Sequence, residues 1–138
     1  GKATWLVHQA EYDHMFSEDP PGDFSAFGDF DVQTFTGDYD VFGDGAIRIL
    51  ELPGHTPGHT ALLLDMPEAG PVILSGDMYH RTESREGVEV PSFNHDADET
   101  KISIERFEAL AEASGAMIII QHEPDDIARL PKPPEALR

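Results

Sequence analysis

Strand-sized apolar segments separated by turn residues follow one another in the first half of the chain. They lie at 32–36, 46–53, 60–66 and 71–77. Asp44-Gly45, between the first two segments, and the sequence PEAG at 67–70 are typical of the tight turns that join antiparallel neighbours. This alternation of short strands and tight turns predicts a β-meander.

A helix and a further strand follow the meander. Residues 99–114 place apolar side chains at helical spacing, with Asp98 expected to cap the start and Gly115 expected to end the helix. The sequence AMIIIQ at 116–121 is typical of a buried strand, and the tail from Pro131 is expected to be irregular. We therefore predict an α/β fold of the α+β type: a mixed sheet with helices on one face, and the other face free to meet a second sheet.

The N-terminal part of the chain has weaker patterns. Residues 4–8 are expected to end a strand, residues 9–16 to form one or two helical turns, and residues 18–31, rich in proline and glycine, to form a loop. Five phenylalanines are expected to lie in the core or to anchor loops: Phe24, Phe27, Phe30, Phe35 and Phe42. The chain opens with Gly1 rather than with methionine, so we expect that something upstream was removed or lies outside these residues.

Charge and composition narrow the classes of function. The net charge is -18, from 27 acidic against 9 basic residues, which argues against nucleic acid and anionic membrane surfaces because phosphates would be repelled. The chain has no cysteine, so a metal must be held by histidine or carboxylate side chains. No apolar run approaches the roughly 18–20 residues that a membrane span needs. We predict a cytoplasmic protein.

Three groups of polar residues stand where apolar strands end. The sequence PGHTPGHT fills 53–60, Ser75-Gly76-Asp77 ends one strand, and Gln121-His122-Glu123 ends another. Each group alone is common in turns and on surfaces, but strand ends that are distant in sequence can converge at one edge of a sheet. Imidazole and carboxylate are good ligands for zinc, manganese and iron, so the combination predicts a metal site.

These groups, in this order and spacing, resemble a known family. The segment 53–59 resembles the loop of the metallo-β-lactamase superfamily that carries a metal-ligand histidine, 75–77 resembles its strand-end aspartate, and 120–122 resembles its last ligand position. Within the superfamily, the segments 9–12 and 90–96 and the helix that follows are similar to the N-acyl homoserine lactonase branch. The resemblance implies half of a four-layer αβ/βα sandwich.

The resemblance also implies roles for particular residues. His55 would bind one metal, Asp77 would bridge two metals, and His122 would bind the other, with His59 outside the ligand set. His80, where many lactonases have tyrosine, would hydrogen-bond to the substrate carbonyl, and Tyr79 beside it would also bind the substrate. Phe93 would line an acyl pocket. The implied cofactors are two divalent ions, zinc first with manganese, iron or cobalt as alternatives, and the implied reaction is hydroxide attack on an ester or lactone.

One departure from the family pattern concerns the other ligands. The His-x-His-x-Asp-His motif is absent from this sequence, and His8, Asp13 and His14 have the wrong spacing to replace it. We therefore predict that residues 1–138 are the C-terminal half of a single domain, whose N-terminal half is the partner that supplies the remaining ligands. Glu123 stands where the lactonase branch often has aspartate.

Other functions stay open at this point. A thioesterase of the hydroxyacylglutathione type, a phosphodiesterase or a β-lactamase would have the same fold. A truncated domain that is inactive alone and serves as an interaction module is the non-catalytic alternative. An apolar sheet face without its partner could also pair two copies of the chain in a homodimer.

Overall fold

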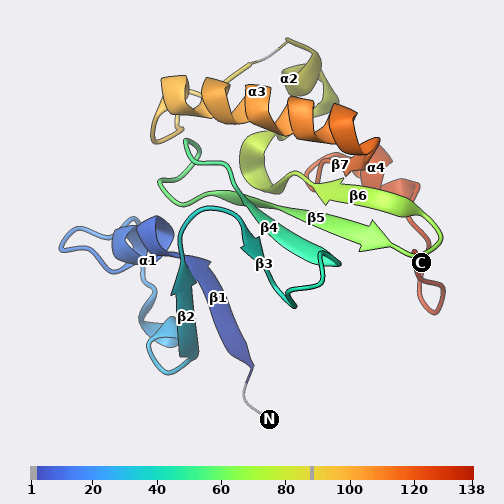
Figure 1. Ribbon diagram of the computed structural model, residues 1–138. Helices are drawn as coiled ribbons and strands as arrows, with labels where there is room; N and C mark the ends of the chain where they lie inside the picture. Colours follow the sequence, from blue (N-terminus) through green and yellow to red (C-terminus); the bar gives the residue numbers. More distant parts are fainter. Residues whose placement is uncertain (1–2, 88) are drawn as a thin grey trace.

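A five-stranded mixed sheet forms the centre of the protein (Figure 1). The computed structural model describes residues 3–87 and 89–138. The strands run in the order β3-β4-β5-β6-β7 and pair antiparallel, except that β6 and β7 are parallel. Their bounds are β3 Tyr39–Asp40, β4 Ile47–Glu51, β5 Thr60–Met66, β6 Gly70–Leu74 and β7 Met117–Ile119.

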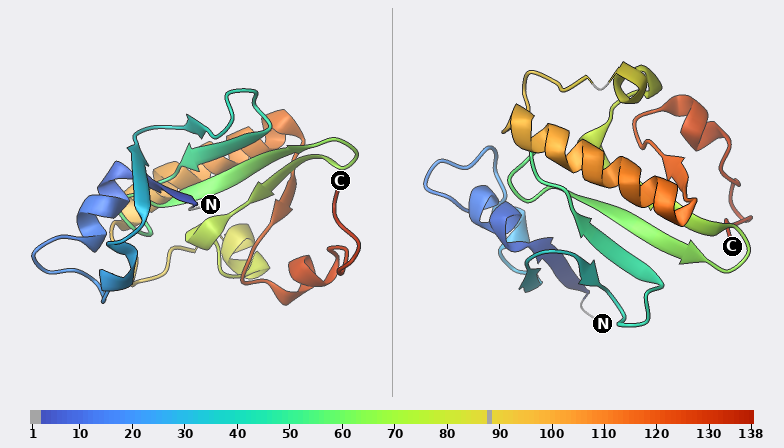
Figure 2. Two further views of the ribbon diagram at one scale, coloured as in Figure 1. Left: turned by 90° about the horizontal axis from the view of Figure 1, so that it is seen from below. Right: turned by 45° about the horizontal axis from the view of Figure 1, so that its top comes forward.

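The parallel pair β6–β7 depends on the longest helix. Parallel neighbours need a crossover connection, and α3, Ala97–Ser114, lies within that connection. Figures 1 and 2 show α3 lying along one face of the sheet. Two shorter helices, α2 at Thr82–Gly87 and α4 at Pro124–Ala128, follow the ends of β6 and β7. The predicted mixed sheet with a helix on one face is confirmed.

The core lies between α3 and the sheet. Leu63 and Ile73 are paired in register on the helix-facing side, and both are buried. Ile104 and Phe107 of α3 pack against this side, and Phe107 is fully buried. At about 25 cal/mol per Å² of apolar surface removed from water, such side chains each contribute about 1.5–3 kcal/mol. Most of the apolar stripe predicted for the helix therefore faces the sheet, whereas Ile102, which was counted in that stripe, is 68% exposed.

The opposite face of the sheet carries a second apolar set. Strand pairing places these side chains on the face away from α3: Ile47, Ile49, Leu62, Leu64 and Leu74. All are half-buried rather than buried. Together with Leu6 of the N-terminal part, Ile49, Leu62 and Leu74 line an open groove. This side of the sheet thus presents apolar surface, as the sequence predicts.

The segment at 32–36 does not join the meander, contrary to the prediction. It forms β2, Asp31–Phe35, which pairs in parallel with β1, Thr4–His8, in a separate two-stranded sheet. Helix α1, Gln9–Met15, follows β1 directly and begins the connection that brings β2 back alongside β1. Because this connection is long enough for a crossover, parallel pairing becomes available to β2.

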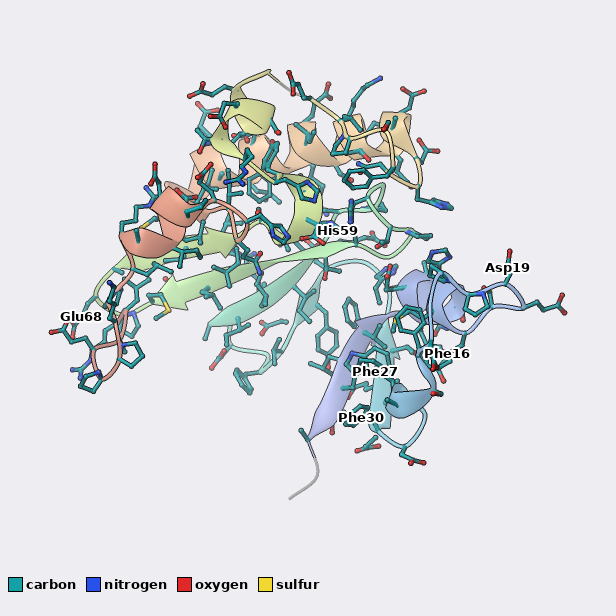
Figure 3. All side chains as sticks on the ribbon, turned by 180° about the vertical axis from the view of Figure 1, so that it is seen from behind. Phe16, Asp19, Phe27, Phe30, His59 and Glu68 are labelled. Atoms are coloured by element: carbon teal, nitrogen blue, oxygen red, sulfur yellow. The ribbon has the colours of Figure 1, made fainter. Side chains whose placement is uncertain are left out.

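Aromatic side chains anchor the loop that joins α1 to β2. A short 3₁₀ turn, η1 at Ser25–Phe27, places the ring of Phe27 5.1 Å from that of Trp5 and 5.6 Å from that of Phe30. Figure 3 shows Phe16, Phe27 and Phe30 around β1 and β2. Phe35 is buried as predicted, whereas Phe42 is 69% exposed and lies in neither the core nor this cluster.

The ends of α3 are defined by two residues outside it. Asp96, not the predicted Asp98, caps the helix, because its Oδ1 accepts hydrogen bonds from the amides of Asp98 and Glu99, each at 2.9 Å. Asp98 lies inside the first turn and pairs instead with Lys101. Gly115 ends the helix as predicted, with a φ of 63° that favours glycine. Among the described residues, no helix is long and apolar enough to cross a membrane.

We expect Asp96→Ala to lower the free energy of unfolding by about 1 kcal/mol, since it leaves two amides of the first turn without a partner. Chemical denaturation monitored by circular dichroism measures this. Asp96→Asn, which keeps an oxygen acceptor, should restore most of the stability. A larger loss from Asp98→Ala than from Asp96→Ala would contradict the assignment of the cap.

Candidate metal centre

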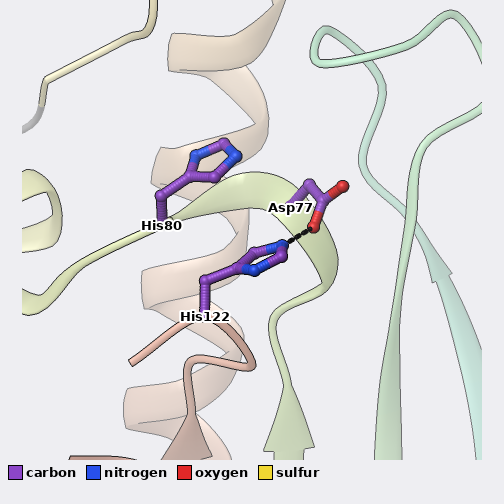
Figure 4. A group of neighbouring side chains, drawn as sticks. All are labelled: Asp77, His80 and His122. Atoms are coloured by element: carbon purple, nitrogen blue, oxygen red, sulfur yellow. Dashed lines mark hydrogen bonds and ion pairs between the residues drawn. The ribbon is translucent and has the colours of Figure 1, made fainter. Parts of the chain in front are cut away.

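The carboxylate of Asp77 lies between two imidazoles from distant parts of the chain. Its Oδ1 is 2.8 Å from His122 Nε2, and its Oδ2 is 3.5 Å from His55 Nε2. Asp77 stands on the 3₁₀ turn η2, Gly76–Met78, directly after β6, and His122 follows β7 (Figure 4). The structure therefore brings together the three residues that the sequence predicted as metal ligands. Each oxygen of one carboxylate faces a different histidine.

His59 fixes the position of Asp77. Its ring is buried, Nδ1 donates to the carbonyl oxygen of Leu52 at 2.8 Å, and Nε2 accepts the amide of Asp77 at 2.9 Å. Burial lowers the pKa of His59, which favours the neutral ring that this pair of hydrogen bonds requires. Figure 3 shows His59 at the end of the sheet where β5 begins. Both nitrogens are used within the protein, so His59 supports the site rather than offering a ligand atom.

Asn94 orients His55. Nδ1 of His55 lies 3.1 Å from Asn94 Oδ1, and Asn94 in turn donates to Thr100 Oγ1 at 3.0 Å. With Nδ1 as the donor, Nε2 is left unprotonated and faces Asp77. A hydrogen bond of this kind on the far ring nitrogen is typical of metal-ligating histidines. Asn94 lies in the segment 90–96 whose resemblance is noted above, but nothing in the sequence pairs it with His55.

Glu11 holds the histidine loop against helix α1. Its Oε2 accepts the amide of Gly58 at 3.0 Å, and a Cβ at Gly58 would lie 2.2 Å from the backbone nitrogen of Glu11. Only glycine allows this approach. Glu11 also lines an open cleft together with His55, His59 and Asp77. The sequence pattern assigned no site role to Glu11, because its partner lies 47 residues away.

His80 also reaches this cluster. Donor atoms of Asp77, His80 and His122 all lie within 4.8 Å of one another. The rings of His80 and His122 are stacked, with centroids 5.2 Å apart, and both extend toward Asp77 (Figure 4). Nδ1 of His80 is buried and has no hydrogen-bond partner among the described residues. Burial lowers the pKa of His80.

The expected role of Tyr79 in substrate binding is not supported by its position. The side chain is 1% exposed and its ring packs edge-on against Phe107 of the core, 5.7 Å between centroids. Its hydroxyl donates to Glu108 Oε1 at 2.8 Å, and Arg85 binds both oxygens of Glu108 at 2.7 Å. Successive residues of an extended backbone point to opposite sides, so Tyr79 faces the core where His80 faces the cluster.

Phe93 lies at the rim of the site. Its ring centroid is 5.9 Å from that of His55 and 5.6 Å from that of His80, and the side chain is 68% exposed.

Glu123 connects the end of the strand that precedes His122 to the segment after His80. Its carboxylate accepts a hydrogen bond from the amide of Thr82 at 3.1 Å. These contacts bring the two histidine-bearing segments together.

The other histidines lie apart from the cluster. His8 is buried, with Nε2 2.7 Å from Glu51 Oε1 and Nδ1 accepting the amide of Ala10. The rings of His14 and His95 are 5.7 Å apart. The donor set that remains, imidazole nitrogens and one carboxylate, fits zinc, manganese, iron or cobalt.

Comparison with known proteins shows what this arrangement is similar to. The chain is 32% identical over 146 aligned positions to the N-acyl homoserine lactonase AttM of Rhizobium radiobacter, covering 96% of this chain and 54% of that protein. It is 30% identical over 136 positions to AttM of Azorhizobium caulinodans, covering 89% of this chain and 51% of the relative. The chain thus spans about half the length of the curated relatives it matches. No protein-family model matches it.

Solved structures show the same fold. An N-acyl homoserine lactone hydrolase with N-hexanoyl-L-homoserine bound at its catalytic metal centre superposes with a TM-score of 0.85 at 23% identity, over 97% of this chain and 52% of that chain. The hydrolase AbOPH of the β-lactamase superfamily superposes with a TM-score of 0.55 at 18% identity, over 75% of this chain and 34% of that chain. The protein therefore shares the fold of these hydrolases over part of their length. Its sequence similarity to N-acyl homoserine lactonases, which the motifs indicated, likewise extends over about half of their length.

We expect Gly58→Ala to lower the free energy of unfolding by about 1–3 kcal/mol, because the added methyl group would overlap the backbone of Glu11. Urea denaturation measures the change. Gly28→Ala is the matched control, since Gly28 is exposed with an ordinary φ of -62°. Equal stability of the two variants would show that the loop does not pack on α1 in this way.

The stability conferred by Glu108 is expected to depend on pH. Hydrogen bonds from Arg85 hold the pKa of Glu108 below its ordinary value of 4.5. A carboxylate with a lowered pKa in the folded state stabilises the fold above the unfolded-state pKa, and this stability is lost as the pH falls through the folded value. Glu108→Gln should cost about 1 kcal/mol at pH 7, reduced by solvent exposure.

Unfolding of both proteins measured from pH 7 down to pH 3 tests this. The difference between wild type and Glu108→Gln should shrink below about pH 4.5. A difference that stays constant over the whole range would mean that the charge of Glu108 contributes nothing.

Proposed function

We propose that this chain is part of a metal-dependent hydrolase that opens lactone rings, with N-acyl homoserine lactones as the first substrate class to test. The observation that carries the proposal is the carboxylate of Asp77, whose two oxygens face His122 and His55 separately. A carboxylate placed in this way is suited to bridge two cations. The similarity to lactonases at 30–32% identity supports the choice of substrate.

The proposed cofactors are two divalent ions, zinc first. Oδ2 of Asp77 with His55 would hold one ion, and Oδ1 with His122 would hold the other. The structural neighbour AidC, described as a dizinc quorum-quenching lactonase, has a TM-score of 0.54 at 18% identity over 68% of this chain and 32% of that chain. When bound, such ions polarise a carbonyl oxygen and lower the pKa of water so that hydroxide is available near pH 7.

Asp77 and the side chains around it would position the reacting groups. Asp77 would hold the attacking oxygen and accept its proton as the bond to the carbonyl carbon forms. It would then pass this proton to the alkoxide released when the ring C–O bond breaks, which gives a hydroxy acid. His80 stands beside it and would donate a hydrogen bond to the oxyanion that forms on the lactone carbonyl. Phe93, at the rim, would contact the acyl chain. Tyr79 has no part in this proposal, because its side chain is committed to the core.

We further propose that an N-terminal segment outside these residues supplies the remaining ligands and covers the sheet. In the described chain, Asp77 and His122 are half-exposed, and the sheet face opposite α3 is apolar and only half-buried. A second apolar sheet is the natural cover for such a face. A homodimer formed through the same face is the alternative arrangement. Hydrolysis would then require the assembled protein, with these 138 residues alone inactive.

Hydrolysis of N-hexanoyl homoserine lactone by the polypeptide that carries these residues tests the function. We expect zinc-dependent ring opening, reduced about 10²-fold or more by Asp77→Asn, which keeps the shape of the side chain but removes its charge. His14→Gln, a histidine outside the cluster, is the control and should retain activity. Activity on thioesters with none on lactones would favour a thioesterase of the same fold, and no metal retention would favour an interaction module.

A further inference from the structure

His80 differs from the buried histidines that have a structural role. His8 and His59 each use both ring nitrogens in contacts within the protein. His80 has no hydrogen bond to either nitrogen among the described residues, and its Nδ1 is shielded from solvent. A buried polar atom without a partner is unfavourable unless something else satisfies it. Within residues 3–87 and 89–138, the ring therefore stands beside Asp77 and His122 with no hydrogen-bond partner of its own.

The backbone around His80 is nevertheless firmly placed. On one side, Tyr79 is anchored through Glu108 to α3 and to Arg85. On the other side, the amide and hydroxyl of Thr82 both bind the carboxylate of Glu123, one residue after His122. These contacts hold the segments of His80 and His122 next to each other, which is the kind of support that a ligand pair needs.

The distances suit coordination of a single cation. Donor atoms of Asp77, His80 and His122 lie within 4.8 Å of one another, and one pair, Asp77 Oδ1 and His122 Nε2, is already at 2.8 Å. Ligands at about 2.0–2.1 Å from a tetrahedral zinc ion are about 3.3 Å apart. His122 is exposed, and a small rotation of its side chain and of the half-buried Asp77 and His80 would close this difference. Two imidazoles and one carboxylate with a fourth open position form a set that zinc uses in catalytic sites.

We infer that His80 is a metal ligand, and that Asp77, His80 and His122 together bind one divalent cation without residues from outside this chain. The two cation positions around Asp77 then differ. The position on the Oδ1 side has three ligands here, whereas the Oδ2 side has His55 and the shared carboxylate. The Oδ1 position therefore fills first. This inference rests on the metal site of the proposed function but not on its substrate.

The role of metal ligand replaces the role of hydrogen-bond donor to the oxyanion that is proposed for His80. A nitrogen that binds a cation through its lone pair cannot donate a hydrogen bond to an oxyanion at the same time. If His80 is a metal ligand, its replacement lowers the affinity of the protein for the metal. If His80 is only a hydrogen-bond donor, its replacement lowers the reaction rate and leaves the metal affinity unchanged. The two roles are therefore separated by a binding measurement.

Zinc titration of the metal-free 138-residue chain tests the inference, with calorimetry for affinity and ¹⁵N imidazole resonances for the ligands. We expect one tight site per chain, with the His80 and His122 resonances shifting together at one equivalent and those of His14 unmoved. His80→Phe keeps an aromatic ring against His122 but removes both nitrogens. It should weaken zinc binding at least about tenfold, equivalent to about 1.4 kcal/mol.

His95→Phe is the matched control, because His95 is exposed and lies outside the group. Far-UV circular dichroism checks the fold of both variants, and if His80→Phe is unfolded, the wild-type resonances decide alone. Unchanged affinity in folded His80→Phe, or an unmoved His80 resonance at saturation, would overturn the inference. Zinc binding through His80 without lactone hydrolysis would leave the inference standing and reject the proposed function, and the reverse result would do the opposite.

Discussion

The hydrogen bond from the amide of Asp77 to Nε2 of His59 holds the site together. It joins the turn after β6 to the loop before β5, and it fixes the backbone at the residue that carries the carboxylate. His59 can accept this bond only because its Nδ1 donates to Leu52, which is itself buried in the core. The buried core at Leu52 thereby supports the backbone of Asp77 through the ring of His59. The placement of His55 and His122 on either side follows from the same framework.

Much of the fold was predictable from local patterns. Alternating apolar residues, tight turns and the spacing in the helix located most of the strands and α3, since each of these signals acts over a few residues. The three residues proposed as metal ligands, His55, Asp77 and His122, could be singled out because each follows the end of an apolar segment. Parallel pairing of β1 with β2 was not predictable in this way, because β2 has the same strand pattern whichever neighbour it pairs with. The parallel pairing of β1 with β2 depends on the connection between the two strands rather than on the residues of β2.

The details of the site depend on contacts between distant residues. Tyr79 and His80 are neighbours in sequence, yet one is bound to Glu108 in the core and the other faces Asp77. The two side chains point to opposite sides because the backbone at Tyr79, directly after η2, is extended, and the apolar pattern does not reveal where η2 ends. The same holds for Glu11 and Asn94, whose partners lie 47 and 39 residues away. A sequence signal identifies a metal ligand more readily than the residue that orients it, because the orienting residue needs only one suitable polar atom.

Zinc content measured by elemental analysis, after dialysis of wild type and Asp77→Asn against the same trace zinc, shows whether Asp77 is part of a metal site. Wild type should retain zinc in stoichiometric amount, and Asp77→Asn should lose it while keeping its far-UV circular dichroism spectrum. Equal zinc in the two proteins, or none in either, would contradict the claim that this carboxylate and its flanking histidines form a metal site.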